Sequence, residues 1–298
     1  MTQPCVSRYF DAEAADVARF LTRSAARDPT LQPASVDGWR AFTRLSFNRG
    51  ARDFRVARAG GRVVAILTST MLARSGLPHR HFRIIVDPDE RRRGIGTLLL
   101  GHVETQEPAH GVVLQCNCRD SWSAGREFLK RSAFEVSRRC LEMELRDLRV
   151  HSVRRTAESV IRSYRATSSD DADWLRLEHE GYADDPDAQR PIADDLEVRR
   201  RKPGFRLWLV ERGGTTVGFL HATAGARARI HSLVVAPDVR GRGFALALMI
   251  HAIRALRREG ATAVTLGVRS ENGPAVGLYR GIGFEVVEEE EMWQRAVP

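Results

Sequence analysis

Residues 231–246 read HSLVVAPDVRGRGFAL, and residues 82–97 read FRIIVDPDERRRGIGT. Both stretches contain the pattern Val-x-Pro-Asp-x-Arg-x-Arg-Gly, and they lie half a chain length apart in a chain of 298 residues. Farther along, Phe134-Glu135-Val136 matches Phe284-Glu285-Val286 at nearly the same separation. Two matches that hold their register in this way indicate an internal repeat.

The repeat predicts two copies of one domain. We place the first at residues 1–148 and the second at 164–298, and we expect residues 149–163 to be a charged linker with room for a short helix from Thr156. In the second copy, strand and helix patterns alternate, and Ser169 is expected to cap the first helix. Strands are expected at 164–167, 205–211, 216–221, 229–235, 262–268 and 284–293, and helices at 169–182, 192–200, 245–258 and 274–280. Each copy is thus predicted to be an α/β domain, a mixed β-sheet covered by helices on both faces.

The composition is that of a globular protein, with 43% hydrophobic residues and no apolar run long enough to predict a transmembrane helix. The first residues lack the pattern of a signal peptide, so we expect a cytoplasmic protein with no membrane partner. The net charge of +9 comes from scattered arginines, and only Lys130 and Lys202 are lysines. Because no basic stretch is interleaved with aromatic residues, we do not expect nucleic acid as the main partner.

The cysteines do not predict a metal site. Cys116 and Cys118 form a close pair, but Cys5 and Cys140 stand alone and no histidine cluster accompanies the pair. A structural zinc ion needs four ligands, so reduced, partly buried thiols and no metal are expected.

The turn that follows the strand at 229–235 has the features of a diphosphate site. Gly241 and Gly243 permit positive φ and close approach of a ligand to the backbone, and Arg240 and Arg242 add positive charge. The start of the next helix offers free N–H groups and the positive end of the helix dipole. The pattern is neither a P-loop nor a dinucleotide fingerprint, whose third glycine would fall at Leu246. A tight turn without a ligand is the alternative.

At these positions the chain resembles the GNAT N-acetyltransferase superfamily, whose acetyl-CoA turn reads Arg/Gln-x-x-Gly-x-Gly/Ala. Arg240, Gly243 and Ala245 fit this turn, and Arg91, Gly94 and Gly96 fit it in the first copy. The later signature of the family fits Asn272, Ala275, Leu278, Tyr279, Gly283 and Phe284. The resemblance implies two tandem GNAT-like domains and acetyl-CoA as co-substrate. It also implies that the residues contacting CoA are Leu233, Val234 and Val235 along the pantetheine arm, Arg240, Gly241, Arg242, Gly243, Phe244 and Ala245 at the pyrophosphate, and Asn272.

Tyr279 is the candidate general acid, because GNAT relatives use a tyrosine at this point to protonate the departing CoA thiolate. A phenol with a pKa near 10 can donate a proton to a thiolate of similar basicity. An aromatic side chain packed before the Gly-Phe turn is the alternative. Leu129 stands at the matching position of the first copy, Trp122 stands where the second copy has Asn272, and Arg92 replaces Gly241. The first copy is therefore expected to be degenerate.

His231 is the candidate general base, because an amine acceptor arrives as ammonium and must lose a proton before it attacks. It resembles the strand histidine that serves the amine in some GNAT members, and Phe82 stands at its place in the first copy. Strand alternation puts His231, Leu233 and Val235 on one face. A histidine satisfied within the core is the alternative. Other candidate bases are Glu178, Glu180 and His221.

The acceptor side in GNAT relatives is formed by the first two helices and their connection, here residues 177–191. This region is acidic, with Glu178, Glu180, Asp184, Asp185 and Asp187, which suits a small-molecule primary amine, although a solvated loop is equally consistent. The run Glu288 to Glu291 is expected to form an exposed strand edge. The function predicted is therefore N-acetyl transfer to such an amine by direct attack. A non-catalytic acyl-CoA-binding regulatory module and a protein or peptide acetyltransferase are the alternatives.

Overall fold

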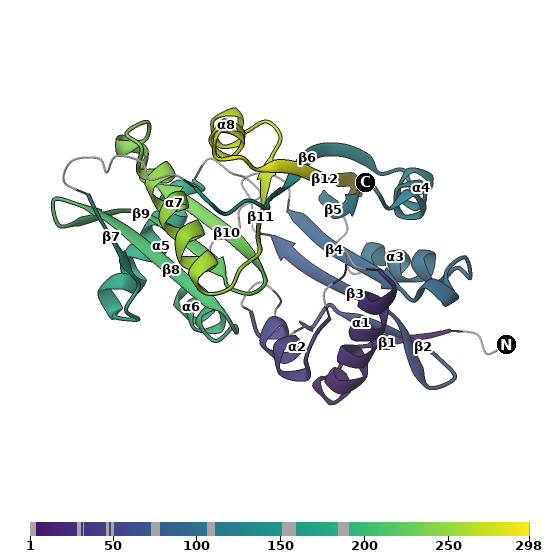
Figure 1. Ribbon diagram of the computed structural model, residues 1–298. Coiled ribbons are helices and arrows are strands. Elements are labelled where there is room, and N and C mark those ends of the chain that lie inside the picture. Colours follow the sequence, from purple (N-terminus) through teal and green to yellow (C-terminus); the bar gives the residue numbers. More distant parts are fainter. Residues whose placement is uncertain are drawn as a thin grey trace. The chain divides into compact units, whose positions relative to one another are not determined.

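The computed structural model describes residues 4–28, 31, 33–45, 48, 51–72, 78–105, 111–150, 159–183 and 191–297 (Figure 1). The chain forms two compact units. The first consists of Met1–Asn117, Ala133–Glu135 and Trp293–Pro298, and the second consists of Cys118–Ser132 and Val136–Met292. These units differ from the sequence repeats, because segments near the end of the first repeat belong to the second unit. The limits 1–148 and 164–298 stay a prediction for the repeats, and the strand Ser159–Ser163 described below extends the second repeat toward the N-terminus.

The first unit contains a mixed sheet. Its strands are β1 (Cys5–Arg8), β2 (Arg55–Ala59), β3 (Arg62–Leu72), β4 (His79–Val86) and most of β5 (Val112–Arg119), in that order across the sheet. The first four strands pair antiparallel, and β4 pairs with β5 in parallel. The helices are α1 (Ala14–Arg27), α2 (Val36–Thr43) and α3 (Ile95–Thr105). Aromatic residues on or next to these elements, among them Phe20, Trp39 and Phe54, contribute to its core.

The second unit contains the longer mixed sheet. Its strands are β6 (Glu135–Leu145), β7 (Ser159–Ser163), β8 (Phe205–Arg212), β9 (Thr215–Thr223), β10 (Arg227–Val235), β11 (Ala263–Arg269) and most of β12 (Glu285–Val297). Their spatial order is β12-β6-β11-β10-β9-β8-β7, and β10 and β11 pair in parallel. The helices are α4 (Ser123–Arg131), α5 (Ser168–Gly181), α6 (Ala193–Arg200), α7 (Phe244–Arg258) and α8 (Gly273–Ile282).

Helices α5 and α7 cover opposite faces of this sheet (Figure 1). The Trp174 ring of α5 packs against Phe219, with ring centroids 6.3 Å apart. His251 of α7 packs against Trp208 instead. Trp208 pairs with Leu220, the neighbour of Phe219 along β9, and adjacent strand residues point to opposite faces. The predicted α/β architecture, with helices on both faces of a mixed sheet, is confirmed.

The start of the second repeat differs from the prediction. The first strand is Ser159–Ser163 rather than 164–167, and it occupies residues assigned to the linker, where a short helix was expected; residues 151–158 lie outside the described residues. Helix α5 begins one residue earlier than predicted, and Thr167 rather than Ser169 caps it by accepting a hydrogen bond from the Asp170 N–H. The chain turns here because Ala166 has a positive φ of 54°.

The glutamate run of β12 is not an exposed edge, so this expectation was wrong. Strand β12 lies beside β6, the last strand of the first repeat. Glu288 forms an ion pair with Arg119, and Glu291 is buried and bonds to Arg126 at 3.0 Å. Both carboxylates pair with arginines of the first repeat, because β12, the last strand of the second repeat, lies beside β6, the last strand of the first.

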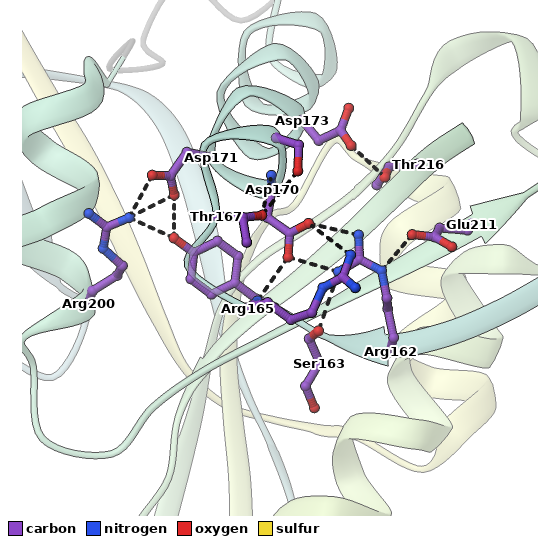
Figure 2. Close-up of polar contacts among 12 residues, drawn as sticks. Arg162, Ser163, Arg165, Thr167, Asp170, Asp171, Asp173, Arg200, Glu211 and Thr216 are labelled. Atoms are coloured by element: carbon purple, nitrogen blue, oxygen red, sulfur yellow. Dashed lines mark hydrogen bonds and ion pairs between the residues drawn. The ribbon is translucent and has the colours of Figure 1, made fainter. Parts of the chain in front are cut away.

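A buried ion pair anchors the start of α5 to the sheet (Figure 2). The side chain of Asp170 is 1% exposed and accepts two hydrogen bonds of 2.8 Å from the Arg162 guanidinium of β7, and Arg162 also bonds to Glu211 of β8. Beside it, Arg200 of α6 bonds to Asp171 of α5 at 2.7 Å. These bonds fix α5 and α6 on the sheet, and the two helices carry side chains of the site described below.

Replacing Asp170 by Asn should lower the free energy of unfolding at pH 7 by about 3 kcal/mol. This value is at the lower end of the cost of breaking a buried ion pair, because Arg162 keeps its ion pair with Glu211. The hydrogen bonds from Arg162 lower the pKa of Asp170 below its usual value. The stabilisation is therefore complete above the unfolded carboxyl pKa of about 3.9 and is lost as the pH falls through the lower folded pKa.

Urea titrations of the wild type and the variant at several pH values measure this difference, which should shrink below pH 4. Asp147→Asn is the control, because Asp147 pairs with Arg149 on the exposed surface, and it should change stability little. Equal stability of the wild type and Asp170→Asn at pH 7 would contradict the anchoring role.

Candidate active site

Strands β10 and β11 separate halfway along their length. Their parallel pairing joins Arg227–Ile230 to Ala263–Leu266 and stops there, while both strands continue. His231 and Gly267 are therefore the first residues beyond the last pair. On its other edge, β10 stays paired with β9 as far as Val235. Main-chain groups of β10 after Ile230 are thus left facing β11 without a strand partner among the described residues, and they can bond to an extended ligand.

His231 lies at a β-bulge, and this overturns the predicted alternation. The register of β10 against β9 shifts between Ile230 and Ser232, so His231 is an extra residue. It stacks on His221, which lies on the α5 face, with ring centroids 4.8 Å apart. Leu233 pairs with Leu220, whose side chain lies on the α7 face. His231 thus does not share a face with Leu233 and Val235.

The bulge brings His231 into a cluster of rings. His221 is buried between His231 and the Phe205 ring, whose centroid is 5.2 Å away, and Trp174 completes the cluster. The Nε2 atom of His231 lies 2.7 Å from the Thr223 hydroxyl. Sequence reasoning missed Thr223, because only the bulge turns His231 toward it.

Both imidazoles are neutral at pH 7. Burial and the positive charges of Arg229, Lys202 and Arg199 lower the pKa of His231 to about 4. Burial is also the main cause that lowers the pKa of His221 to about 2. The side chain of His231 retains solvent exposure, whereas His221 is buried. Of the two, His231 is the one that a ligand can reach.

Glu178 does not stand free. It is buried on α5, and its two carboxylate oxygens accept hydrogen bonds of 2.8 and 3.0 Å from Arg199 of α6. The guanidinium of Arg199 also lies over the Trp174 ring. Glu180 is exposed and bonds to Arg176 on the same helix. The three aspartates of the predicted acidic lip, residues 184, 185 and 187, lie outside the described residues.

On the same face of the sheet, an ion pair between β10 and β6 passes over β11, and its arginine lies two residues before His231 on β10. Arg229 of β10 makes two hydrogen bonds of 2.8 Å to the carboxylate of Glu142 on β6. Gly267 of β11 lies beneath the pair, and a Cβ atom there would meet the Glu142 carboxylate at 3.0 Å. Glu142 belongs to the first repeat, so no pattern within the second repeat could have indicated it.

Tyr279 lies on α8 and is buried against Phe284, with ring centroids 5.9 Å apart. Burial raises its pKa to about 12, and Tyr182 at the end of α5 contributes. The phenol is therefore protonated at neutral pH. Within the described part of the chain its hydroxyl has no hydrogen-bond partner, so it has a proton available for donation.

The turn after β10 has the backbone that the glycines predicted. Gly241 and Gly243 have φ of 76° and 85°, and a Cβ added to Gly241 would meet no atom within 4 Å. The first helical bond of α7 runs from the Ala247 N–H to the Gly243 carbonyl, so the preceding N–H groups are free of helix partners. Arg240 is used differently from the prediction, since its Nε donates to the Val235 carbonyl at 3.1 Å and holds the turn.

Strand β10 is held closely from both sides at Val234. A Cβ on Gly181, at the end of α5, would lie 2.4 Å from the Val234 side chain, and a Cβ on Gly218 of β9 would lie 2.7 Å from its carbonyl. Asn272 caps α8, because its side chain accepts a hydrogen bond of 3.2 Å from the Ala275 N–H. These contacts fix the elements around the separated strands.

The first repeat keeps the backbone of the turn but lacks the candidate acid and base. Arg92 has a φ of 66°, as Gly241 does, although the left-handed region is costly for a residue other than glycine. Arg91 bonds to the Val86 carbonyl as Arg240 bonds to Val235. Phe82 and Leu129 are buried and carry no titratable group.

A cavity of about 820 Å³ in the second unit lies elsewhere, between α7, the end of α8 and the end of β6. None of the predicted site residues lines it, so it does not define the acceptor site. Among the described residues, no cluster of His, Cys, Asp and Glu side chains is arranged to hold a metal ion. No helix in the described part of the chain is long and apolar enough to cross a membrane.

A model of the acetyltransferase (GNAT) family matches the chain twice, over residues 19–134 and 169–284. The chain belongs to the GNAT acetyltransferase family. This membership makes it an acyltransferase, and it confirms the resemblance and the tandem arrangement predicted from the sequence.

Proteins named mycothiol acetyltransferase are similar to this chain. The one from Frankia casuarinae is 30% identical over 225 residues, which span 69% of this chain and 65% of the relative, slightly less than two thirds. The one from Parafrankia sp. is 30% identical over 79% of this chain and 80% of the relative. The one from Geodermatophilus obscurus is 28% identical over 93% of this chain and 92% of the relative.

Solved structures share the fold. A tandem GNAT protein from the clavulanic acid biosynthesis pathway has a TM-score of 0.76, with 17% identity and 99% of each chain covered. A GCN5-related N-acetyltransferase from Sphaerobacter thermophilus has a TM-score of 0.72, with 20% identity, and covers 99% of this chain and 96% of that one. At these identities the likeness concerns the fold alone.

Proposed function

We propose that the second repeat transfers the acetyl group of acetyl-CoA to a primary amine of a small molecule. The observation that carries this proposal is the separation of β10 from β11 at His231, directly before a turn built to bind an anion. GNAT acetyltransferases use acetyl-CoA, and relatives of this chain are named mycothiol acetyltransferase. Both points support the choice of substrates.

The proposed CoA site follows β10 and its turn. Main-chain groups of Leu233 and Val235 on the unpaired edge would bond to the amides of the pantetheine arm, and Val234 lies between them with its own carbonyl toward β9. The N–H groups from Gly241 to Ala245 would hold the pyrophosphate, since both glycines have a positive φ and a Cβ on Gly241 would meet no atom within 4 Å. Asn272 contributes by capping α8 beside this path.

In the proposed reaction the amine nitrogen attacks the thioester carbonyl, a C–N bond forms and the C–S bond breaks. His231, neutral at pH 7, takes the proton that the amine must lose. A backbone N–H near Val235 would stabilise the oxyanion, and Tyr279 donates its proton to the thiolate that leaves. Glu178 is bound to Arg199, so we propose that it positions α5 against α6 rather than serving as the base.

We also propose that the protein works in the cytoplasm. All four cysteines are free thiols, as expected in a reducing compartment. Burial raises the pKa of Cys118 to about 12, which keeps that thiol protonated and unreactive.

The direct test is a screen of amines with acetyl-CoA and the full chain, in which the release of CoA thiol is followed. Polyamines, aminoglycosides, amino-sugar thiols, amino acids and peptides with a free N-terminus cover the main acceptor classes. Thiol release that depends on the amine supports the proposal. CoA binding without turnover on any amine would favour the non-catalytic alternative.

Gly243→Asp should abolish or greatly weaken CoA binding, because it places a negative charge in the diphosphate site. Calorimetric titration with CoA measures the effect. Gly243→Ala separates charge from backbone strain at the φ of 85°, and Gly94→Asp makes the matched change in the first repeat. Unchanged affinity in Gly243→Asp, with loss in Gly94→Asp, would move the binding site to the first repeat.

Tyr279→Phe should lower kcat by roughly 10²- to 10⁴-fold, the usual contribution of a general acid. The ring packing against Phe284 is kept, so folding and the affinity for acetyl-CoA should change little. Steady-state kinetics, with chemistry shown to be rate-limiting, measure the loss. Leu129→Ala is the counterpart in the first repeat and should leave kcat unaffected; a wild-type kcat in Tyr279→Phe would leave the tyrosine a packing residue.

His231→Gln should remove the part of the pH dependence of kcat/KM that comes from protonation of His231. In the wild type, His231 is protonated and inactive as a base below its pKa of about 4, so kcat/KM should rise with pH through that value. A second rise should follow as the acceptor loses its own proton. The variant should keep only this second rise, at a lower rate. An identical profile in the two proteins would exclude His231 as the base.

A further inference from the structure

Three positively charged side chains surround the stacked imidazoles on the α5 face. Arg229, Lys202 and Arg199 each lie close enough to His231 to act on its protonation, and Lys202 and Arg199 also act on His221. The charge around the candidate base is therefore positive.

Two of these cations are neutralised by carboxylates. Arg199 is bound by both oxygens of Glu178, and Arg229 is bound by both oxygens of Glu142. Lys202 is different. In the part of the chain that the structure describes, its ammonium group forms no ion pair and no hydrogen bond, so its charge has no carboxylate partner among these residues.

The backbone holds Lys202 at this place. It lies between α6 and β8, and its carbonyl accepts a hydrogen bond of 3.1 Å from the N–H of Phe205, whose ring packs on His221. Two residues along, the Gly204 carbonyl accepts a bond of 2.7 Å from the Ala224 N–H, at the end of β9. A Cβ on Gly204 would meet the Ala224 carbonyl at 2.4 Å, so the loop is pressed against the sheet.

The unpaired charge is accessible from solvent next to an accessible base. Lys202 and His231 are both exposed at the residue level. Neighbouring atoms nevertheless remove part of the water around the lysine, and this burial, with the charge of Arg199, lowers its pKa. A partly desolvated cation gains more from an anionic partner than a fully hydrated one does.

We propose that Lys202 binds a carboxylate of the acceptor, so that the acceptor is an amine that also carries a carboxylate, such as an amino acid. This inference rests on the proposed function and names its substrate class. Lys202 would hold the carboxylate while the amine of the same molecule faces His231. A polyamine would bring only positive charge to this face and would be repelled.

The test compares an amino acid with its carboxamide, two acceptors that differ only in the charge at one end. The wild type should prefer the amino acid in kcat/KM by roughly 10- to 100-fold, the range for a charge-assisted hydrogen bond, when rates are compared per unprotonated amine. Lys202→Met should raise KM for the amino acid by that factor, and it should leave KM for the carboxamide unaffected.

Two controls accompany the variant. Lys130→Met changes the chain's other lysine, which bonds to Glu127 on α4, and should keep the preference. Lys202→Arg keeps the charge and should retain most of it. Calorimetric binding of the N-acetyl amino acid and its amide to each protein gives the same comparison without turnover, so a variant with damaged catalysis is still informative.

The outcomes separate this inference from the proposed function. If no amine releases thiol from acetyl-CoA, the proposed function fails. If amines are acetylated but the amino acid and the carboxamide are used equally well by the wild type, the carboxylate site is overturned and the acetyltransferase remains. A preference that survives in Lys202→Met also overturns the assignment of Lys202.

Discussion

The separation of two parallel strands is the constraint on which the site depends. Where β10 and β11 stop pairing after Ile230, the main chain of β10 loses its partner on one edge and becomes free to bind an extended ligand. The bulge at His231 coincides with this point and turns the imidazole to the α5 face. The close contacts of Gly181 and Gly218 with Val234 keep the unpaired part of the strand in place.

The charged side chains around the bulge come from several helices and strands. Each arginine near the imidazoles has its own carboxylate, Glu178 from α5 or Glu142 from β6, so the charges are arranged in pairs rather than spread over the surface. The imidazoles stay neutral because they are buried beside this cationic group. A neutral histidine is the form that can accept a proton, although its low pKa makes it a weak base.

Much of the fold and the turn could be predicted from the sequence, because they follow from local patterns. Gly241 and Gly243 have the positive φ expected of them, and the helices and strands after Ile192 lie within a few residues of their predicted bounds. The face of His231 could not be predicted, because a bulge breaks the two-residue period without a local signal. The place of the Glu288 to Glu291 strand was also mispredicted, because its partners come from the other repeat.

The presence of β6 beside β11 bears on how such a chain could have evolved. After an ancestral duplication, the first copy could lose its own reactive side chains, as Phe82 and Leu129 indicate, without becoming dispensable. Its last strand supplies Glu142 and covers the edge of β11, so a chain cut between the repeats would remove the carboxylate that pairs with Arg229 and expose a strand edge. A duplicated gene in this state can no longer return to a single copy, because each half has become part of the other.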